Sequence, residues 1–151
     1  SPIRIIADSR LRTPLTAKLI AGARQTPTWM VALESADEER RRAFSDLGVD
    51  VIQVGTDANG NPDTGGALKV LAEKGLQSLL VEGGGRLIAS LLLAGVVDRL
   101  SWFRASKIIG GDGIPVAAAL GIDDMDRAPR FNRVGMEPLG NDVLETYAVE
   151  A

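Results

Sequence analysis

Apolar residues along the chain follow two spacings, which predict strands and helices in alternation. Four short apolar runs predict buried strands, at residues 2–9, 28–33, 49–54 and 77–82. Three segments with apolar residues three or four positions apart predict helices, at residues 35–48, 64–75 and 85–95. Because strands that alternate with helices form βαβ crossovers, the sequence predicts an α/β fold with a mainly parallel sheet.

The pattern changes after residue 95. Three further strands are expected, over residues 97–106, Arg130–Pro138 and Val143–Val149. The last two flank the turn "LGND", which predicts a C-terminal antiparallel hairpin that closes the sheet. Trp102 and Phe103 fall on opposite faces of their strand, so one is expected in the core and the other at an interface.

The first predicted helix has recognisable ends. Ser35 or Asp37 can cap its N-terminus, since both side chains carry an oxygen that accepts a hydrogen bond from a free backbone N–H. Gly48 is expected to end it.

Composition narrows the class of protein. A chain of 151 residues suits one domain, and its net charge of −3 disfavours nucleic acid as a partner. No apolar run approaches the roughly 20 residues of a membrane span, so no membrane role is expected. The absence of cysteine fits a cytoplasmic protein.

The chain also has no histidine, which limits its chemistry more strongly. Without His or Cys, neither a Ser-His-Asp triad nor a Cys-His pair can form, and no zinc site of the usual kind is expected. Chemistry would have to come from a carboxylate, a Lys, a Tyr or a cofactor. No catalytic residue can be identified from the sequence.

The stretch "LLVEGGGR" joins a predicted strand to a predicted helix through Gly83, Gly84 and Gly85. Glycines there allow an anion to approach the backbone, and the free N–H groups of the helix would point at it. We interpret the turn as a phosphate site; the alternative is a tight turn without a ligand. Glu82 would lie beside the same glycine turn, either as a ligand contact or as a solvated carboxylate.

A second candidate is the loop "ADSRLRTP" after the first strand. The loop offers two hydroxyls and two guanidinium groups, which suit phosphate oxygens, from Ser9, Thr13, Arg10 and Arg12. The alternative is a solvated loop. Two phosphate-binding loops at one sheet edge would suit a dinucleotide.

Taken together, three segments resemble the C-terminal reductase domain of the bifunctional riboflavin-biosynthesis deaminase–reductase. The segments are "PIRIIADSRLRTPLTAKL", "LLVEGGGRLIASLLLAGVVDRL" and "ASKIIGGDG". The resemblance covers nearly the whole chain. It implies a three-layer dihydrofolate-reductase-like fold with a mainly parallel sheet, helices on both faces and a C-terminal antiparallel hairpin.

The resemblance also implies an activity, the NADPH-dependent reduction of a small-molecule substrate. The substrate would be 5-amino-6-(5-phosphoribosylamino)uracil, whose ribosyl group becomes ribityl. Carried over by position, Ser9 would contact the adenosine end of NADPH, and Glu82 would contact the substrate. Because they are cations in the same loop, Arg10 and Arg12 are expected to hold the 2′-phosphate. The pyrophosphate would lie against the residues of one turn and helix: Gly83, Gly84, Gly85, Arg86, Leu87, Ile88, Ala89 and Ser90. The resemblance further suggests a cis Gly83–Gly84 peptide bond, against a trans turn with one glycine at positive φ.

By the same resemblance, residues 1–151 would be a reductase domain without its N-terminal strand and loops, and without the deaminase domain. Two alternatives stay open, a dihydrofolate or other pteridine reductase and a non-catalytic nucleotide-binding or assembly module. Glu82 favours the riboflavin family, because the other reductases carry an apolar residue there. A homodimer is expected through the exposed edge of the C-terminal hairpin, with Trp102 or Phe103 as an anchor.

Overall fold

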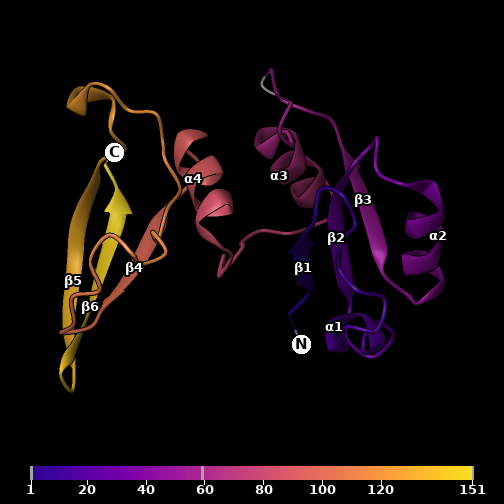
Figure 1. Cartoon of the computed structure of the whole chain (residues 1–151), viewed down its shortest axis with the longest axis horizontal. Helices are drawn as coiled ribbons and strands as arrows, with labels where there is room; N and C mark the ends of the chain where they lie inside the picture. Colours follow the sequence, from indigo (N-terminus) through magenta and orange to yellow (C-terminus); the bar gives the residue numbers. More distant parts are fainter. Residues whose placement is uncertain (1, 59, 151) are drawn as a thin grey trace. The chain divides into compact units, whose positions relative to one another are not determined.

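The structure is a computed structural model that describes residues 2–58 and 60–150 (Figure 1). The chain divides into two compact units, with the division between Leu79 and Leu80. The first unit contains six elements: β1 (Arg4–Ala7), α1 (Lys18–Ala21), β2 (Thr28–Leu33), α2 (Glu38–Asp46), β3 (Asp50–Val54) and α3 (Thr64–Glu73). The second contains α4 (Gly85–Leu93), β4 (Arg99–Arg104), the 3₁₀ turn η1 (Met125–Arg127), β5 (Phe131–Leu139) and β6 (Asp142–Val149).

The strands of the first unit form a parallel sheet in the order β1-β2-β3. Residue Ile6 of β1 lies opposite Met30 of β2, which in turn lies opposite Val51 of β3. The predicted βαβ arrangement is therefore present, with α2 joining β2 to β3. Because the strands run the same way, their carboxyl ends share one edge, where the loop after β1 begins.

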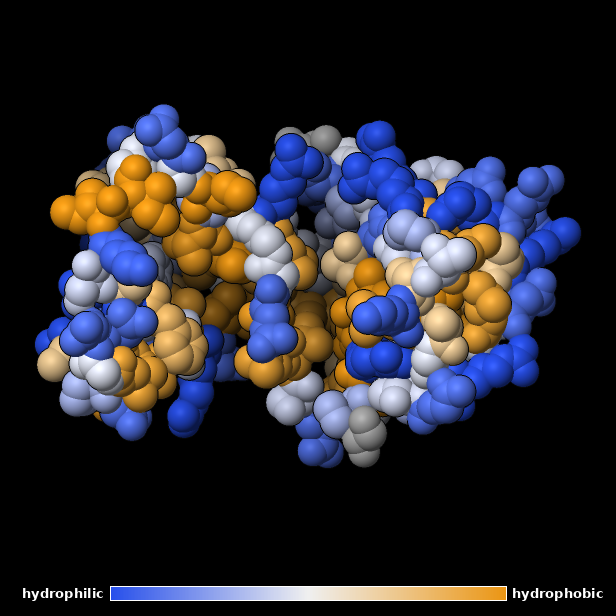
Figure 2. All heavy atoms as spheres, turned by 60° about the horizontal axis from the view of Figure 1, so that its bottom comes forward, coloured by the Kyte–Doolittle hydropathy of each residue, from blue (hydrophilic) through white to orange (hydrophobic). Residues whose placement is uncertain are grey.

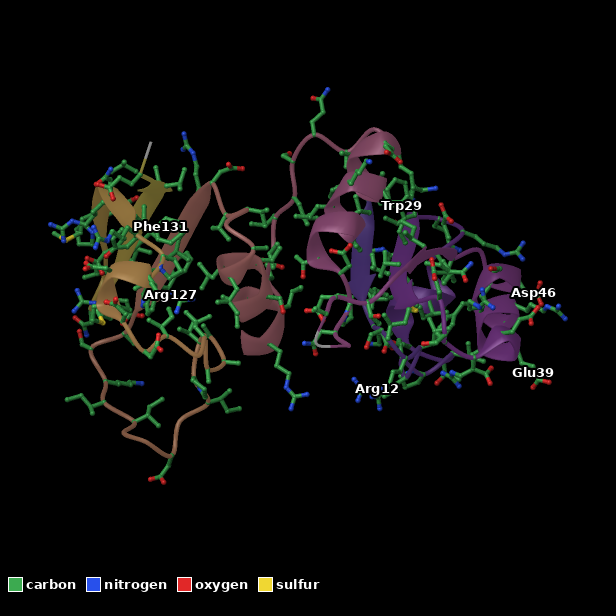
Figure 3. All side chains as sticks on the ribbon, turned by 90° about the horizontal axis from the view of Figure 1, so that it is seen from above. Arg12, Trp29, Glu39, Asp46, Arg127 and Phe131 are labelled. Atoms are coloured by element: carbon green, nitrogen blue, oxygen red, sulfur yellow. The ribbon has the colours of Figure 1, made fainter. Side chains whose placement is uncertain are left out.

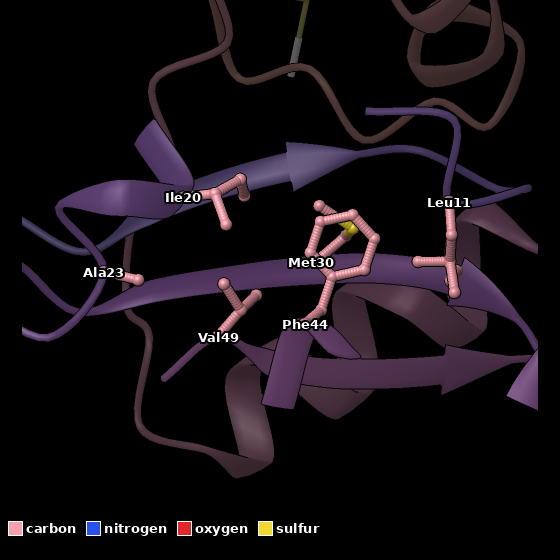
Figure 4. Close-up of a cluster of buried hydrophobic side chains, with 7 residues drawn as sticks. Leu11, Ile20, Ala23, Met30, Phe44 and Val49 are labelled. Carbon is pink, nitrogen blue, oxygen red and sulfur yellow. The ribbon is translucent and has the colours of Figure 1, made fainter. Parts of the chain in front are cut away.

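The middle strand β2 contributes to two hydrophobic clusters, one on each face of the sheet. Met30 and Ala32 point to a cluster that includes Ile20 of α1 and Phe44 of α2 (Figure 4). Trp29 and Val31 point the other way, against the cluster that contains Leu71 of α3. Alternation along one strand thus places helices on both faces, as the sequence predicts.

The caps of the helices explain where they begin. The carboxylate of Asp37 accepts a hydrogen bond of 2.7 Å from the backbone N–H of Arg40, so Asp37 and not Ser35 caps α2. Asp63 caps α3 in the same way through Gly66. The four-residue helix α1 was not expected, because its apolar residues are too few to show helical spacing.

The second unit is built on an antiparallel sheet in the order β4-β6-β5. β5 and β6 form the predicted hairpin, and Gly140 in its two-residue turn has a φ of +65°, which an L-residue rarely adopts. Glu145 lies in the central strand β6 and is buried between Arg104 of β4 and Arg133 of β5, at 3.6 and 3.2 Å. This ion-pair cluster links all three strands.

Two expectations about apolar residues are wrong. The segment 77–82 is not a strand in the structure, and the side chain of Leu80 is 84% exposed. An extended segment becomes a strand only when a neighbour pairs with it, and no described residue does so here. The single sheet expected from the sequence is accordingly divided into two. Trp102 and Phe103 are both exposed, so neither is a core residue.

Apolar side chains are common on the surface of the second unit, on the left in Figure 2. They include residues of the segment between β4 and η1 and of β5: Ile108, Ile109, Ile114, Val134 and Met136. Among the residues described, no helix is long and apolar enough to cross a membrane.

Candidate functional site

The loop after β1 is organised around Asp8, the last residue before the chain turns. Its carboxylate accepts two hydrogen bonds from Thr13, one from the backbone N–H at 2.6 Å and one from the hydroxyl at 2.7 Å. The carbonyl of Asp8 accepts the N–H of Leu11 at 3.1 Å. Only 8% of Asp8 is exposed, so these bonds are shielded from water. The two ends of the loop are therefore tied to one side chain.

The pKa of Asp8 reflects two opposing effects. Burial raises it, because a charged carboxylate loses hydration. Hydrogen bonds from the hydroxyl and N–H of Thr13 and from the backbone of Arg12 and Arg10 lower it, and together they outweigh burial. The pKa of Asp8 therefore lies below its ordinary value, and the loop contains a stable buried anion at neutral pH.

Leu11, at the centre of the loop, has an unusual backbone. Its φ is +54°, in the left-handed region that costs an L-residue about 1–2 kcal/mol. Its side chain is fully buried beside Met30 and Phe44 in the cluster of Figure 4. Burial of a leucine side chain stabilises by about 1.5–3 kcal/mol, which is enough to offset the strain.

Arg40 of α2 holds the same loop from outside. Its Nε donates to the carbonyl of Leu11 at 2.5 Å, and a terminal nitrogen donates to the carbonyl of Thr13 at 2.8 Å. The guanidinium also lies 5.5 Å from the ring centroid of Phe44, within range of a cation–π interaction. One planar group thus binds two carbonyls of the loop, although 29 and 27 positions separate it from them in the chain.

The predicted phosphate ligands of this loop face outward. Arg10 and Arg12 are exposed and Ser9 is half-buried. Figure 3 shows Arg12 projecting from the first unit into solvent. Its Nε lies 3.9 Å from the Asp8 carboxylate, but with 77% of the side chain exposed this ion pair adds little stability. The loop therefore presents two exposed guanidinium groups, of which that of Arg12 is weakly paired with Asp8.

The glycine turn before α4 has a simpler backbone than expected. The structure contains no cis bond among the residues it describes, so the predicted cis Gly83–Gly84 bond is wrong. The alternative of a glycine at positive φ is wrong as well, because none of the three turn glycines, all described, has one. Gly84 is extended, with φ −71° and ψ 169°, and is the N-cap of α4. Extended residues before a helix need no glycine.

The space around each of the three glycines indicates a different reason for having glycine at that position. A Cβ at Gly85 would lie 3.0 Å from the carbonyl oxygen of Pro115 and 3.2 Å from the nitrogen of Ala118, so a side chain would push against backbone. A Cβ at Gly83 would meet the flexible end of Leu87. A Cβ at Gly84 would meet nothing within 4 Å. The chain itself gives no reason for glycine at residue 84.

The first turn of α4 is open to an anion. The N-cap residue is Gly84, so no N-cap side chain accepts a hydrogen bond from the helix. No acidic residue lies in the first turn of this helix, which the structure describes in full. The N–H of Leu87 donates to the carbonyl of Gly84 at 3.0 Å, and the positive end of the helix dipole lies at this terminus. Glu82 and Arg86 are exposed beside the turn.

The remaining predicted contacts lie further along α4. Leu87, Ile88 and Ser90 are half-buried and Ala89 is buried. The hydroxyl of Ser90 donates to the carbonyl of Arg86 at 3.0 Å. The predicted residues thus fall into two groups. Ser9, Arg10 and Arg12 belong to the first unit, and residues 82–90 belong to the second.

Two hollows on the surface lie elsewhere. One, of about 350 Å³, lies between α2 and β3 and is lined by both acidic and basic side chains, including Glu38 and Arg42. The other, of about 230 Å³, lies between the end of α4 and the start of β5 near Arg127 and Phe131, both labelled in Figure 3. Neither contains a predicted site residue.

Sequence reasoning missed Asp8, Leu11 and Arg40, which shape the first loop. Asp8 could have been noticed, because it is the only carboxylate in an otherwise apolar strand end. Arg40 gives no such signal, since it is one of three adjacent arginines on a charged helix.

Comparison with known proteins places nearly the whole chain in a family. Residues 1–144 match the family described as the RibD C-terminal domain. The riboflavin biosynthesis protein RibD of Actinobacillus pleuropneumoniae is 37% identical over 150 residues, which are 98% of this chain and 39% of that protein. The 2,5-diamino-6-ribosylamino-4(3H)-pyrimidinone 5′-phosphate reductase of Methanothermobacter thermautotrophicus is 31% identical over 151 residues, 99% of this chain and 67% of that protein. The chain spans less than half the length of the RibD relative.

Solved structures agree on the fold. RibD of Acinetobacter baumannii matches with a TM-score of 0.80 and 22% identity, over 97% of this chain and 37% of that one. The riboflavin biosynthesis reductase Rib7 of Saccharomyces cerevisiae matches with a TM-score of 0.71 and 21% identity, over 99% and 65%. The fold is therefore the dihydrofolate-reductase-like α/β fold that the resemblance implied.

Proposed function

Because the chain belongs to the family of RibD C-terminal domains, we propose that it is a reductase domain of riboflavin biosynthesis that uses NADPH. The substrate we propose is 5-amino-6-(5-phosphoribosylamino)uracil, whose ribosyl group is reduced to ribityl. A relative is named for the reduction of a 2,5-diamino-pyrimidinone with the same ribosylamino 5′-phosphate, which supports this class of substrate. NADPH would supply the hydride, so a chain without histidine or cysteine can serve the reaction.

The observation that carries the proposal is the open space at Gly84. A Cβ at residue 85 would press on backbone atoms of the chain, whereas at residue 84 the backbone is extended and a Cβ would touch nothing within 4 Å. The N-terminus of α4, which is the positive end of the helix dipole, lies at the same residue. A ligand that comes close to the backbone explains both facts, and a pyrophosphate fits the positive end of a helix.

The loop after β1 supports a phosphorylated nucleotide. We assign Ser9 to the adenosine end of NADPH and the exposed Arg10 and Arg12 to its 2′-phosphate, because guanidinium groups bind phosphate oxygens in pairs. Glu82, exposed beside the glycine turn, is assigned to the substrate. A carboxylate there can accept hydrogen bonds from ribose hydroxyls or a pyrimidine N–H.

The names of the relatives favour a pyrimidine substrate over a pteridine. A module that binds nucleotide without catalysis would share the binding features above but would not oxidise NADPH when the ribosylaminopyrimidine phosphate is added. The loss of NADPH absorbance on addition of the substrate therefore separates a reductase from a non-catalytic nucleotide-binding module.

The first test is Gly84→Val, measured by titration calorimetry with NADPH. A Cβ at residue 84 would enter the space of the pyrophosphate and meets no atom of the protein within 4 Å, so we expect binding to be lost while the fold stays largely intact. Gly135→Val is the matched control: it lies in β5, and its Cβ would make an ordinary contact of 3.8 Å with Thr146. Unchanged NADPH affinity in Gly84→Val would refute the phosphate assignment.

A further inference from the structure

We propose that Arg40 is a positioning residue: it holds the Asp8–Thr13 loop in the form that presents Arg10 and Arg12 to the 2′-phosphate of NADPH. The inference rests on the proposed function. It adds a specificity role for a residue of α2 that is not itself assigned to the ligand.

The loop has two carbonyls whose hydrogen-bond donors come from outside it. Leu11 has a φ of +54°, and the turn around it leaves the carbonyls of Leu11 and Thr13 without partners in a strand or helix. Asp8 satisfies the N–H groups of the loop, and Arg40 satisfies these two carbonyls. Asp8 thus binds donors of this short loop, and Arg40 binds two of its acceptors.

Arg40 is itself fixed in place. Its backbone N–H donates to the N-cap carboxylate of Asp37, and its guanidinium lies over the ring of Phe44. Phe44 is fully buried in the same cluster as Leu11. The helix, its cap and the core therefore determine where the guanidinium lies, and the guanidinium determines where the loop backbone lies.

A planar fork is needed for this contact. Nε and a terminal nitrogen of one guanidinium reach two carbonyls that are two residues apart in the loop. A lysine ammonium is a single point charge and cannot place two donors at that separation. Because the carbonyls are directed to Arg40, the side chains of Arg10 and Arg12 remain exposed for a ligand.

The experiment compares Arg40→Met, Arg40→Lys and Arg42→Met in the full chain. Arg42 is the matched control, since it lies on the same helix, is 75% exposed and pairs with Glu38. Two readouts are used for each protein. Amide hydrogen exchange of Leu11 and Thr13 reports the closure of the loop, and calorimetric titration with NADPH and with NADH reports the consequence for the ligand.

We expect both Arg40 variants to exchange these amides about tenfold faster and to bind NADPH about tenfold more weakly, since losing a charge-assisted hydrogen bond shifts an equilibrium by about that factor. NADH affinity should change by less than about twofold, because the 2′-phosphate is absent. Arg42→Met should resemble the wild type in both readouts, and circular dichroism should show all variants folded.

Three results would overturn the inference. Unchanged exchange in Arg40→Met would mean that the guanidinium does not hold the loop. Full recovery by Arg40→Lys would mean that charge alone is responsible. Faster exchange with an unchanged ratio of NADPH to NADH affinity would mean that the loop does not set selectivity. Failure of the wild type to bind either dinucleotide would instead refute the proposed function first, and the positioning role would fall with it.

Discussion

The buried carboxylate of Asp8 makes a prediction that can be worked out from its contacts. Asp8→Ala removes an ionised acceptor that receives two short hydrogen bonds from Thr13, and leaves that N–H and hydroxyl without a partner inside the protein. Hydrogen bonds to charged groups contribute about 1.5–3 kcal/mol each, and because the two share one oxygen we expect a total loss of about 2–4 kcal/mol. The ion pair with Arg12 is too exposed to add to this.

Acid should reduce the effect of the substitution. The pKa of Asp8 is depressed in the folded protein, so its stabilising contribution is complete above about pH 5 and is lost as the pH falls through the ordinary value and then the folded one. The difference in free energy of unfolding between wild type and Asp8→Ala should therefore shrink steadily on acidification.

Urea unfolding followed by tryptophan fluorescence can measure the stability of the structural unit that contains Asp8. The chain has two tryptophans, Trp29 in β2 and Trp102 in β4, so a Trp102→Phe background leaves the fluorescence to report on the unit that contains Asp8. We expect a fall in the urea midpoint of about 1 M or more at neutral pH. Asp46→Ala, at the exposed end of α2 (Figure 3), is the control. Equal urea midpoints for Asp8→Ala and Asp46→Ala would contradict this role of Asp8. A difference between wild type and Asp8→Ala that does not shrink in acid would contradict it as well.

Three other predictions follow from separate features. Replacing Arg10 and Arg12 together with Ala should weaken NADPH binding and leave NADH nearly unchanged in calorimetry; equal losses would remove the 2′-phosphate assignment. Phe44→Ala should lower the free energy of unfolding by about 3–5 kcal/mol in urea, because its side chain is fully buried, and a loss below 1 kcal/mol would mean that the cluster of Figure 4 collapses around the gap. Light scattering should give twice the mass of the chain, since β5 leaves a sheet edge with the exposed apolar residues Val134 and Met136; a monomer at high concentration would count against the homodimer.

What could be predicted from the sequence depended on local signals. β2 was expected at the residues where it is found, and Gly140 marked the turn of the hairpin, because alternation and turn chemistry depend on neighbours in the chain. The segment 77–82 has the composition of a strand, yet strand formation depends on a partner that its own residues do not specify.

The candidate site was predictable to a similar extent. Ser9, Arg10 and Arg12 are visible as a polar cluster after a strand, and the glycines before α4 as an opening. The clamp by Arg40 and the positive φ of Leu11 could not be foreseen, because they arise from contacts between residues 29 positions apart and from the burial of one side chain. The backbone angles of the glycine turn were equally hidden, since glycine permits every conformation that was considered.

The three adjacent glycines have different prospects in evolution. A Cβ at residue 85 would lie 3.0 Å from the carbonyl oxygen of Pro115, and the N–H of Ala118 donates to the carbonyl of Gly85 at 2.9 Å. We therefore expect glycine to be favoured there in descendants that keep this fold. Gly84 is constrained by the proposed ligand alone. In related domains that no longer bind a dinucleotide, residue 84 should vary while residue 85 remains glycine. A survey of homologous sequences could therefore identify domains that have lost the reductase function from residue 84 alone.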